Sequence, residues 1–146
     1  MSRERFFSWD AYGPVRFGMR LEDAEQHAGA ATTPFNSTRN PGCDWVSFAS
    51  LPNVLFMVES GIVTRADSKA GIPNILGIEY GMSVDQAKAK APAAIVMPHK
   101  YDPGGLYLKM GSKDGKKAIV METGEGKVDA IRAGLEPSVS YVEGCS

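Results

Sequence analysis

Several features that would point directly to a function are scarce in this chain of 146 residues. Its 16 basic and 17 acidic residues nearly cancel, leaving a formal net charge of -1. Proteins that bind nucleic acid or anionic membranes usually carry a basic surface, which this balance does not provide. The longest uncharged apolar runs, such as 91–98, are far shorter than the roughly 18–20 residues of a membrane span. We therefore expect no nucleic-acid partner and at most a peripheral contact with a membrane.

The N-terminus also lacks the pattern of a secretory signal. Its first seven residues, MSRERFF, carry charge but are not followed by an apolar region of about 7–15 residues. Two interpretations stay open at this point. Either the protein is cytoplasmic, or a new methionine has replaced a cleaved signal.

Cysteine and histidine are rare, with two of each. Their spacing matches no metal-binding set, so we predict neither a metal nor another cofactor. Cys43 and Cys145 each follow a glycine near the end of an expected strand. A disulfide between them would close a loop of about 100 residues and stabilise the fold by about 4–5 kcal/mol in the chain-entropy model. The alternative is two unrelated reduced thiols, and no nucleophile signature surrounds either cysteine.

Turn-forming residues are abundant, with 16 glycines and nine prolines. Because they form no low-complexity run, they indicate many turns and hence many short strands. With 43% hydrophobic and 23% charged residues, the composition excludes a disordered chain. It indicates a strand-rich globular domain over residues 1–146.

The most informative pattern is an internal similarity at a spacing of 63 residues. It predicts two copies, 12–74 and 75–139, followed by a tail at 140–146. Three pairs of segments share this spacing in the same order. They are FGMRLEDA at 17–24 with YGMSVDQA at 80–87, FMVESG at 56–61 with IVMETG at 119–124, and KAGI at 69–72 with RAGL at 132–135.

Each copy is expected to begin with a short helix. Ser83 and Gln86 have the spacing of a capping box, and Pro92 ends the second helix. Gly29 ends the first helix, which begins at Leu21. Alternating or continuously apolar segments then predict strands at 45–49, 54–58, 62–65, 106–110, 118–121, 128–132 and 138–142. The predicted fold class is α+β, with two tandem copies of helix plus antiparallel hairpins forming one curved antiparallel sheet, and the short helices on one face.

An aromatic-Gly-Met turn leads into each expected helix, at Phe17-Gly18-Met19 and at Tyr80-Gly81-Met82. This arrangement resembles the tandem repeats of the β-lactamase inhibitory protein family and the turn and helix of SmpA/OmlA-like domains. The resemblance implies a periplasmic or secreted protein that binds other proteins. The inhibitor family carries a pair of cysteines inside each repeat, and this chain does not.

Aromatic side chains supply the main candidates for a binding surface. Trp45 and Tyr107 are outward members of alternating strands, and Tyr101 and His99 belong to a turn-rich loop at 99–105. Trp and Tyr on an uncovered sheet face are common anchors of protein interfaces. The other possibility is that the N-terminal segment or the helices cover them.

We therefore expect an exported, non-enzymatic protein-binding module of the inhibitor, immunity or envelope-assembly type, with another protein as partner. One alternative is a small hydrolase that uses the 99–105 loop or the carboxylates near Glu122, although these straddle an expected hairpin tip. Another is a structural envelope domain without a dedicated ligand.

Overall fold

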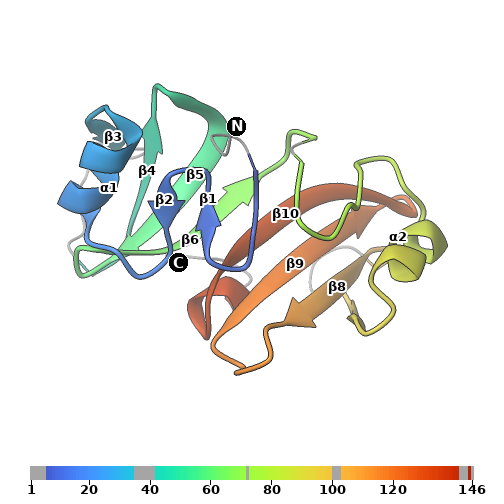
Figure 1. The fold of residues 1–146 in the computed structure, drawn as a ribbon. Helices are drawn as coiled ribbons and strands as arrows, with labels where there is room; N and C mark the ends of the chain where they lie inside the picture. Colours follow the sequence, from blue (N-terminus) through green and yellow to red (C-terminus); the bar gives the residue numbers. More distant parts are fainter. Residues whose placement is uncertain (1–5, 35–41, 72, 100–102, 142–144, 146) are drawn as a thin grey trace.

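The computed structural model describes residues 6–34, 42–71, 73–99, 103–141 and 145. Its main feature is an eight-stranded sheet in the order β3-β4-β5-β6-β10-β9-β8-β7, in which all neighbouring strands are antiparallel (Figure 1). A separate pair, β1 and β2, lies near the N-terminus. In chain order the elements are β1 (Ala11–Tyr12), β2 (Val15–Arg16), α1 (Leu21–Ala28), β3 (Thr32–Pro34), β4 (Asp44–Phe48), β5 (Leu51–Glu59), β6 (Ile62–Ser68), α2 (Val84–Lys90), β7 (Ile95–Pro98), β8 (Leu106–Gly111), β9 (Lys117–Gly124), β10 (Lys127–Leu135) and the 3₁₀ helix η1 (Ser138–Ser140).

The predicted fold class, α+β with tandem copies of helix plus hairpins, is wrong. The molecule is mostly β, with 47% of the described residues in strands and 14% in helices. The helices have only eight and seven residues, whereas β5 and β10 have nine each. Edge strands β3 and β7 and the small β1–β2 sheet add strands that the helix-plus-hairpin scheme did not contain. None of the helices in the described part of the chain is long and apolar enough to cross a membrane.

Local signals in the sequence did identify both helices correctly. Ser83 accepts a hydrogen bond from the backbone N–H of Gln86, and the Gln86 side chain accepts one from the Ser83 backbone N–H, which confirms the predicted capping box. The first helix ends at Gly29, in the left-handed conformation that glycine adopts without strain. The capping position of α1 holds Arg20, which makes no side-chain capping bond.

The larger core lies on one face of the sheet, where the N-terminal segment packs. Phe7 and Tyr12 are fully buried, with ring centroids 4.7 Å apart. Tyr12 also contacts Phe56 of β5, whose ring packs edge-on against Phe48 of β4. Ala24 and Ala87, in α1 and α2, contribute small buried side chains to the same core. Contacts between aromatic rings thus form one part of this core, beside its more numerous aliphatic side chains.

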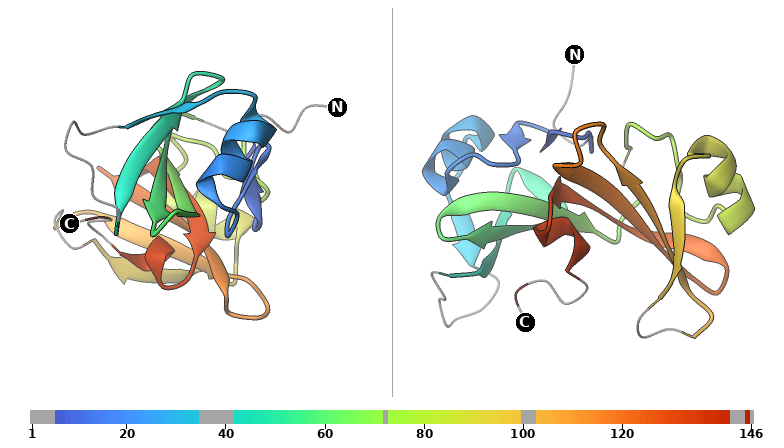
Figure 2. Two further views of the ribbon diagram at one scale, coloured as in Figure 1. Left: turned by 90° about the vertical axis from the view of Figure 1, so that its left-hand side faces the viewer. Right: turned by 90° about the horizontal axis from the view of Figure 1, so that it is seen from below.

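The opposite face carries a smaller core beneath residues 138–141, called here the C-terminal turn. The buried side chain of Val139 packs there with those of Tyr107, Ala118 and Val120. Residues 138–140 form η1 and not the strand that was predicted from Ser138 to Val142. Figure 2 shows η1 on the far side of the sheet from the N-terminal segment. The C-terminal turn thus covers part of a face that was expected to be open.

Candidate functional site

The site is built where β6 and β10 pair at the middle of the sheet. Their register places Arg132 opposite Asp67 and Gly134 opposite Arg65. A Cβ on Gly134 would lie 2.3 Å from the carbonyl oxygen of Thr64 and 2.6 Å from the Cα of Arg65, so the strands approach this closely only because the residue is glycine. Alternation along the strands directs the arginines and Asp67 away from the larger core.

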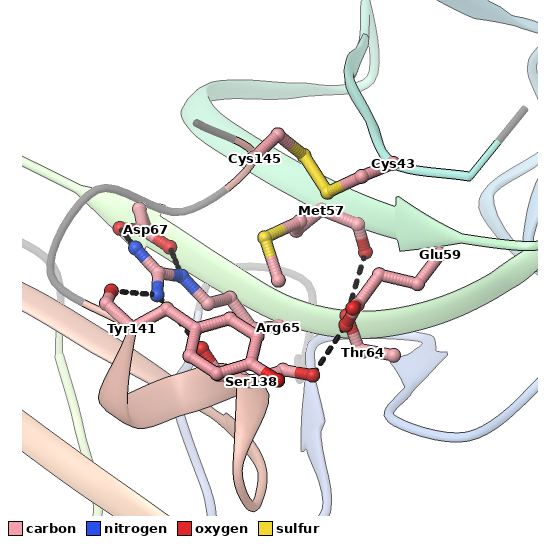
Figure 3. Close-up of a disulfide and its surroundings, with 9 residues drawn as sticks. All are labelled: Cys43, Met57, Glu59, Thr64, Arg65, Asp67, Ser138, Tyr141 and Cys145. Carbon is pink, nitrogen blue, oxygen red and sulfur yellow. Dashed lines mark hydrogen bonds and ion pairs between the residues drawn. A yellow bond between two sulfur atoms is a disulfide. The ribbon is translucent and has the colours of Figure 1, made fainter. Parts of the chain in front are cut away.

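Arg65 is the more completely bound of two buried arginines. Its Nε and Nη2 donate to the two carboxylate oxygens of Asp67, at 2.7 and 2.9 Å. Its Nη1 donates to the carbonyl oxygens of Ser138 at 2.9 Å and of Tyr141 at 2.6 Å (Figure 3). The guanidinium also lies 5.3 Å from the centre of the Trp45 ring. Arg65 thus joins β6 to the C-terminal turn.

Arg132 is held in a similar set of contacts on β10. Its Nε donates to the carbonyl oxygen of Val139 at 2.7 Å, and its Nη1 binds a carboxylate oxygen of Glu122. The guanidinium lies 5.5 Å from the centre of the Tyr107 ring. The second oxygen of Glu122 is 3.1 Å from Nε2 of His99, and the His99 ring stacks on Tyr107 with centroids 4.6 Å apart.

These side chains border an open groove of about 490 Å³. The side chains of Arg65 and Arg132 are only 3% and 5% exposed, whereas those of Asp67 and Glu122 are 29% and 25% exposed. Solvent in the groove therefore meets carboxylates before it meets guanidinium groups. The groove is lined by Trp45, Asn53, Leu55, Arg65, Asp67, Ser68, Lys69, Glu122, Ala130, Ile131 and Arg132.

The electrostatics of the groove centre on Asp67. Burial raises the pKa of Asp67 above its ordinary value, and the nearby negative charge of Glu122 acts in the same direction. The hydrogen bonds and positive charge of Arg65, together with the charge of Arg132, oppose this effect without cancelling it. The neighbouring arginines therefore do not fully offset the cost of removing the charged Asp67 carboxylate from water.

The predicted disulfide between Cys43 and Cys145 is confirmed. The Cα atoms are 5.4 Å apart, within the usual range of about 4.4–6.8 Å. The bridge joins residues 102 positions apart in the sequence and lies next to Met57 of β5 (Figure 3). It attaches the end of the chain to the segment that precedes β4, two residues before Trp45.

Three of the four aromatic or histidine residues predicted as binding residues lie on this side of the sheet. Trp45 is half-buried and lines the groove, while Tyr107 and His99 lie next to Glu122 at its border. Among the described residues, the N-terminal segment, α1 and α2 pack into the larger core on the opposite face, but Tyr107 is 5% exposed because Val139 and His99 pack against it. Tyr101 lies outside the described residues. Whether these residues bind a partner stays a prediction.

Sequence reasoning missed the charged centre of the site. The strands were expected to end at Arg65 and at Arg132. In fact β6 continues to Ser68 and β10 to Leu135. The signal that could have found the site is the alternation of Arg65 and Asp67 with the small residues Thr64, Ala66 and Ser68 of the same strand.

The structure also locates the residues that were considered for a metal site and for a hydrolase. In the part of the chain that the structure describes, no group of three or more His, Cys, Asp or Glu residues could hold a metal ion. His99 of the 99–105 loop lies 3.1 Å from a carboxylate oxygen of Glu122, a contact of the kind found in hydrolases with a catalytic triad. Residues 100–102 of that loop lie outside the described residues. The hydroxyl of Ser68 donates to the carbonyl oxygen of Asn53, so this serine of the groove is held by the backbone.

Comparison with known proteins yields no family for this chain. No family model matches it. A uroporphyrinogen decarboxylase from a Nitratiruptor species is 29% identical over 94 residues, which are 63% of this chain and 27% of that protein. The chain thus spans about a quarter of the length of the curated relative that it matches.

One solved structure is similar in fold. It is the 1.5 Å crystal structure of an extracellular protein containing an SCP domain, from Bacillus anthracis strain Ames. The TM-score is 0.51 with 13% identity, over 82% of this chain and 44% of that one. At this identity the likeness concerns the fold alone.

Proposed function

We propose that this protein is an exported, non-enzymatic protein-binding module of the inhibitor, immunity or envelope-assembly type. The observation that carries the proposal is the open groove over one face of β5, β6 and β10, with Trp45 in its wall and buried arginines beneath it. A half-buried aromatic ring on a rigid sheet supplies contact area with little loss of conformational freedom on binding.

The C-terminal turn supports the same proposal because it makes the groove rigid. Arg65 and Arg132 together hold three of its carbonyl groups, and Ser138 donates a hydrogen bond to Glu59 of β5. Residues that are held on several sides keep their positions before a partner arrives, which lowers the entropic cost of association.

Export is supported by the disulfide. Such bridges form and persist in oxidising compartments and are rare in cytosolic proteins. Here the bridge also attaches the C-terminal end to the segment before β4, so it adds to the stability of the folded state. The resemblance of the aromatic-Gly-Met turns to those of periplasmic and secreted repeat proteins leads to the same proposal.

The test is a capture experiment with variants on two surfaces. The oxidised protein, immobilised, is exposed to the extracytoplasmic fraction of its source organism, and the retained proteins are identified. Trp45→Ala removes the aromatic wall, and Ala130→Gln fills the groove without a change of charge. Ile75→Ala is the matched control, since Ile75 is 49% exposed and pairs with Phe7 at the N-terminal segment.

We expect a protein that is retained by the wild type and by Ile75→Ala, with at least about tenfold less retained by both groove variants, as for a hot-spot residue. Equal retention by all four proteins would reject the groove as the binding surface.

A hydrolase is the second candidate because His99 pairs with Glu122. Hydrolysis of simple esters by the wild type that His99→Ala abolishes would favour it.

A further inference from the structure

Within the arginine–carboxylate pairs of the groove, the carboxylates are the more exposed groups, and Lys69 adds one exposed positive charge to the lining. Arg65 already donates to both oxygens of Asp67 and to two backbone carbonyls. Arg132 is bound to Glu122 and to the carbonyl of Val139. Both guanidinium groups are thus directed into the protein, whereas the carboxylates remain about a quarter exposed.

We infer that the groove binds a basic side chain, and specifically an arginine presented by the partner protein. This inference rests on the proposed function and adds the chemistry of the partner. An ionised carboxylate has about four acceptor positions, and the structure shows two hydrogen bonds at each of Asp67 and Glu122. A planar guanidinium with five donors is suited to bind such carboxylates while its flat face lies against an aromatic wall such as Trp45.

The electrostatics of Asp67 agree with this assignment. Burial keeps the pKa of Asp67 raised in spite of Arg65 and Arg132, so a further cation in the groove would stabilise its charged form. An anionic ligand would have the opposite effect, because it would meet Asp67 and Glu122 before either guanidinium.

Lys69 can be used to test whether the groove prefers a positively or a negatively charged ligand. It is exposed, lines the same groove and immediately follows β6, so its ammonium group would repel an arginine and attract an anion. Lys113 is a matched control, since it is an exposed lysine in the loop between β8 and β9 and does not line this groove.

The experiment uses three small probes with the full oxidised chain. They are Nα-acetyl-arginine N-methylamide, the citrulline compound that has the same shape without the charge, and Nα-acetyl-glutamate N-methylamide. Binding is followed by chemical-shift changes in ¹H–¹⁵N spectra, where the indole N–H of Trp45 reports on the groove and that of Trp9 reports on a distant surface.

We expect the arginine probe to bind with a dissociation constant on the order of 1 mM, and the citrulline probe about tenfold more weakly, because only the first makes charge-assisted hydrogen bonds. Lys69→Ala should increase the affinity for the arginine probe about two- to threefold, while Lys113→Ala should leave that affinity unchanged. Glu122→Gln and Asp67→Asn should each weaken it. If Asp67→Asn does not fold, Glu122→Gln and Lys69→Ala still decide the question.

Three results would overturn the inference: preference for the glutamate probe, equal binding of arginine and citrulline, or weaker arginine binding in Lys69→Ala. Its failure can be distinguished from failure of the proposed function. A partner captured through the groove, without binding of the arginine probe, rejects this inference alone. Binding of the probe without any groove-dependent partner rejects the protein-binding role and leaves a site for a basic ligand.

Discussion

Asp67 lies directly opposite Arg132 across the β6–β10 pair, yet both of its carboxylate oxygens are bound by Arg65 of its own strand. Arg132 binds Glu122 of β9 instead. Each arginine therefore has its own carboxylate and at least one carbonyl of the C-terminal turn. This arrangement joins the middle of the sheet to the end of the chain, so changes at the site should also change stability.

Replacement of Arg132 with methionine tests this connection. Arg132→Met keeps an unbranched, shorter side chain, removes the donor to the carbonyl of Val139 and leaves Glu122 with His99 as its remaining partner. Because the site is partly open to solvent, we expect a loss of about 2 kcal/mol in the free energy of unfolding, measured with urea, less than for a fully buried pair. Arg20→Met is the control, since Arg20 pairs with Glu22 on the surface and should change stability by less than about 0.5 kcal/mol. Equal effects of the two substitutions would contradict the prediction.

The close approach of β6 and β10 predicts that Gly134 tolerates no side chain. A Cβ there would lie 2.6 Å from the Cα of Arg65, which forces the backbone to move. We expect Gly134→Ala to destabilise the protein by about 2–3 kcal/mol in chemical denaturation. Gly111→Ala on β8 is the matched control, because a Cβ added there would meet no atom within 4 Å and stability should change little. A stable Gly134→Ala variant would show that the strands can separate at this point.

Much of the local structure followed from the sequence, because the signals for it are themselves local. The capping pair Ser83 and Gln86 and the terminating Gly29 each act within one helical turn, and they placed both helices. The fold class was wrong because it depends on how many strands join the sheet. The edge strands β3 and β7 are short and exposed, so they carry little apolar alternation by which to recognise them.

The site was only half predictable for a related reason. Trp45 and Tyr107 stood out because alternation separates them from core residues on their own strands. Arg65 and Asp67 did not, since buried charges are rare and a charge usually marks the end of a strand. Their burial depends on the carbonyls of Ser138 and Tyr141, more than 70 positions away in the sequence, and no local pattern records that contact.

The ion pair of Glu136 predicts a dependence of stability on pH. Burial acts to raise the pKa of Glu136, but the hydrogen bonds from Lys109 and Ser140 outweigh it, and the pKa is lowered. A carboxyl group with a lowered pKa stabilises the fold above its unfolded pKa of about 4.5, and this contribution is lost as the pH falls toward the folded value. Between about pH 5.5 and 3.5 we therefore expect Glu136→Gln to lose less stability than the wild type. Glu79→Gln, at an exposed glutamate, is the control for the change of charge, and an identical slope for Glu136→Gln and the wild type would reject the prediction.

The disulfide should contribute more to stability than any single side chain discussed above. It joins residues 102 positions apart, and a loop of that size restricts the unfolded chain strongly. We expect the double variant Cys43→Ser/Cys145→Ser to be about 4–5 kcal/mol less stable in urea than the oxidised wild type. A dithiol reductant should bring the wild type to the stability of the variant and leave the variant unchanged. Because Arg65 and Arg132 still hold Ser138 and Val139 without the bridge, the variant should remain folded at low urea. A wild type whose stability does not respond to the reductant, although both thiols are shown to be free, would contradict this account of how the C-terminal end is held.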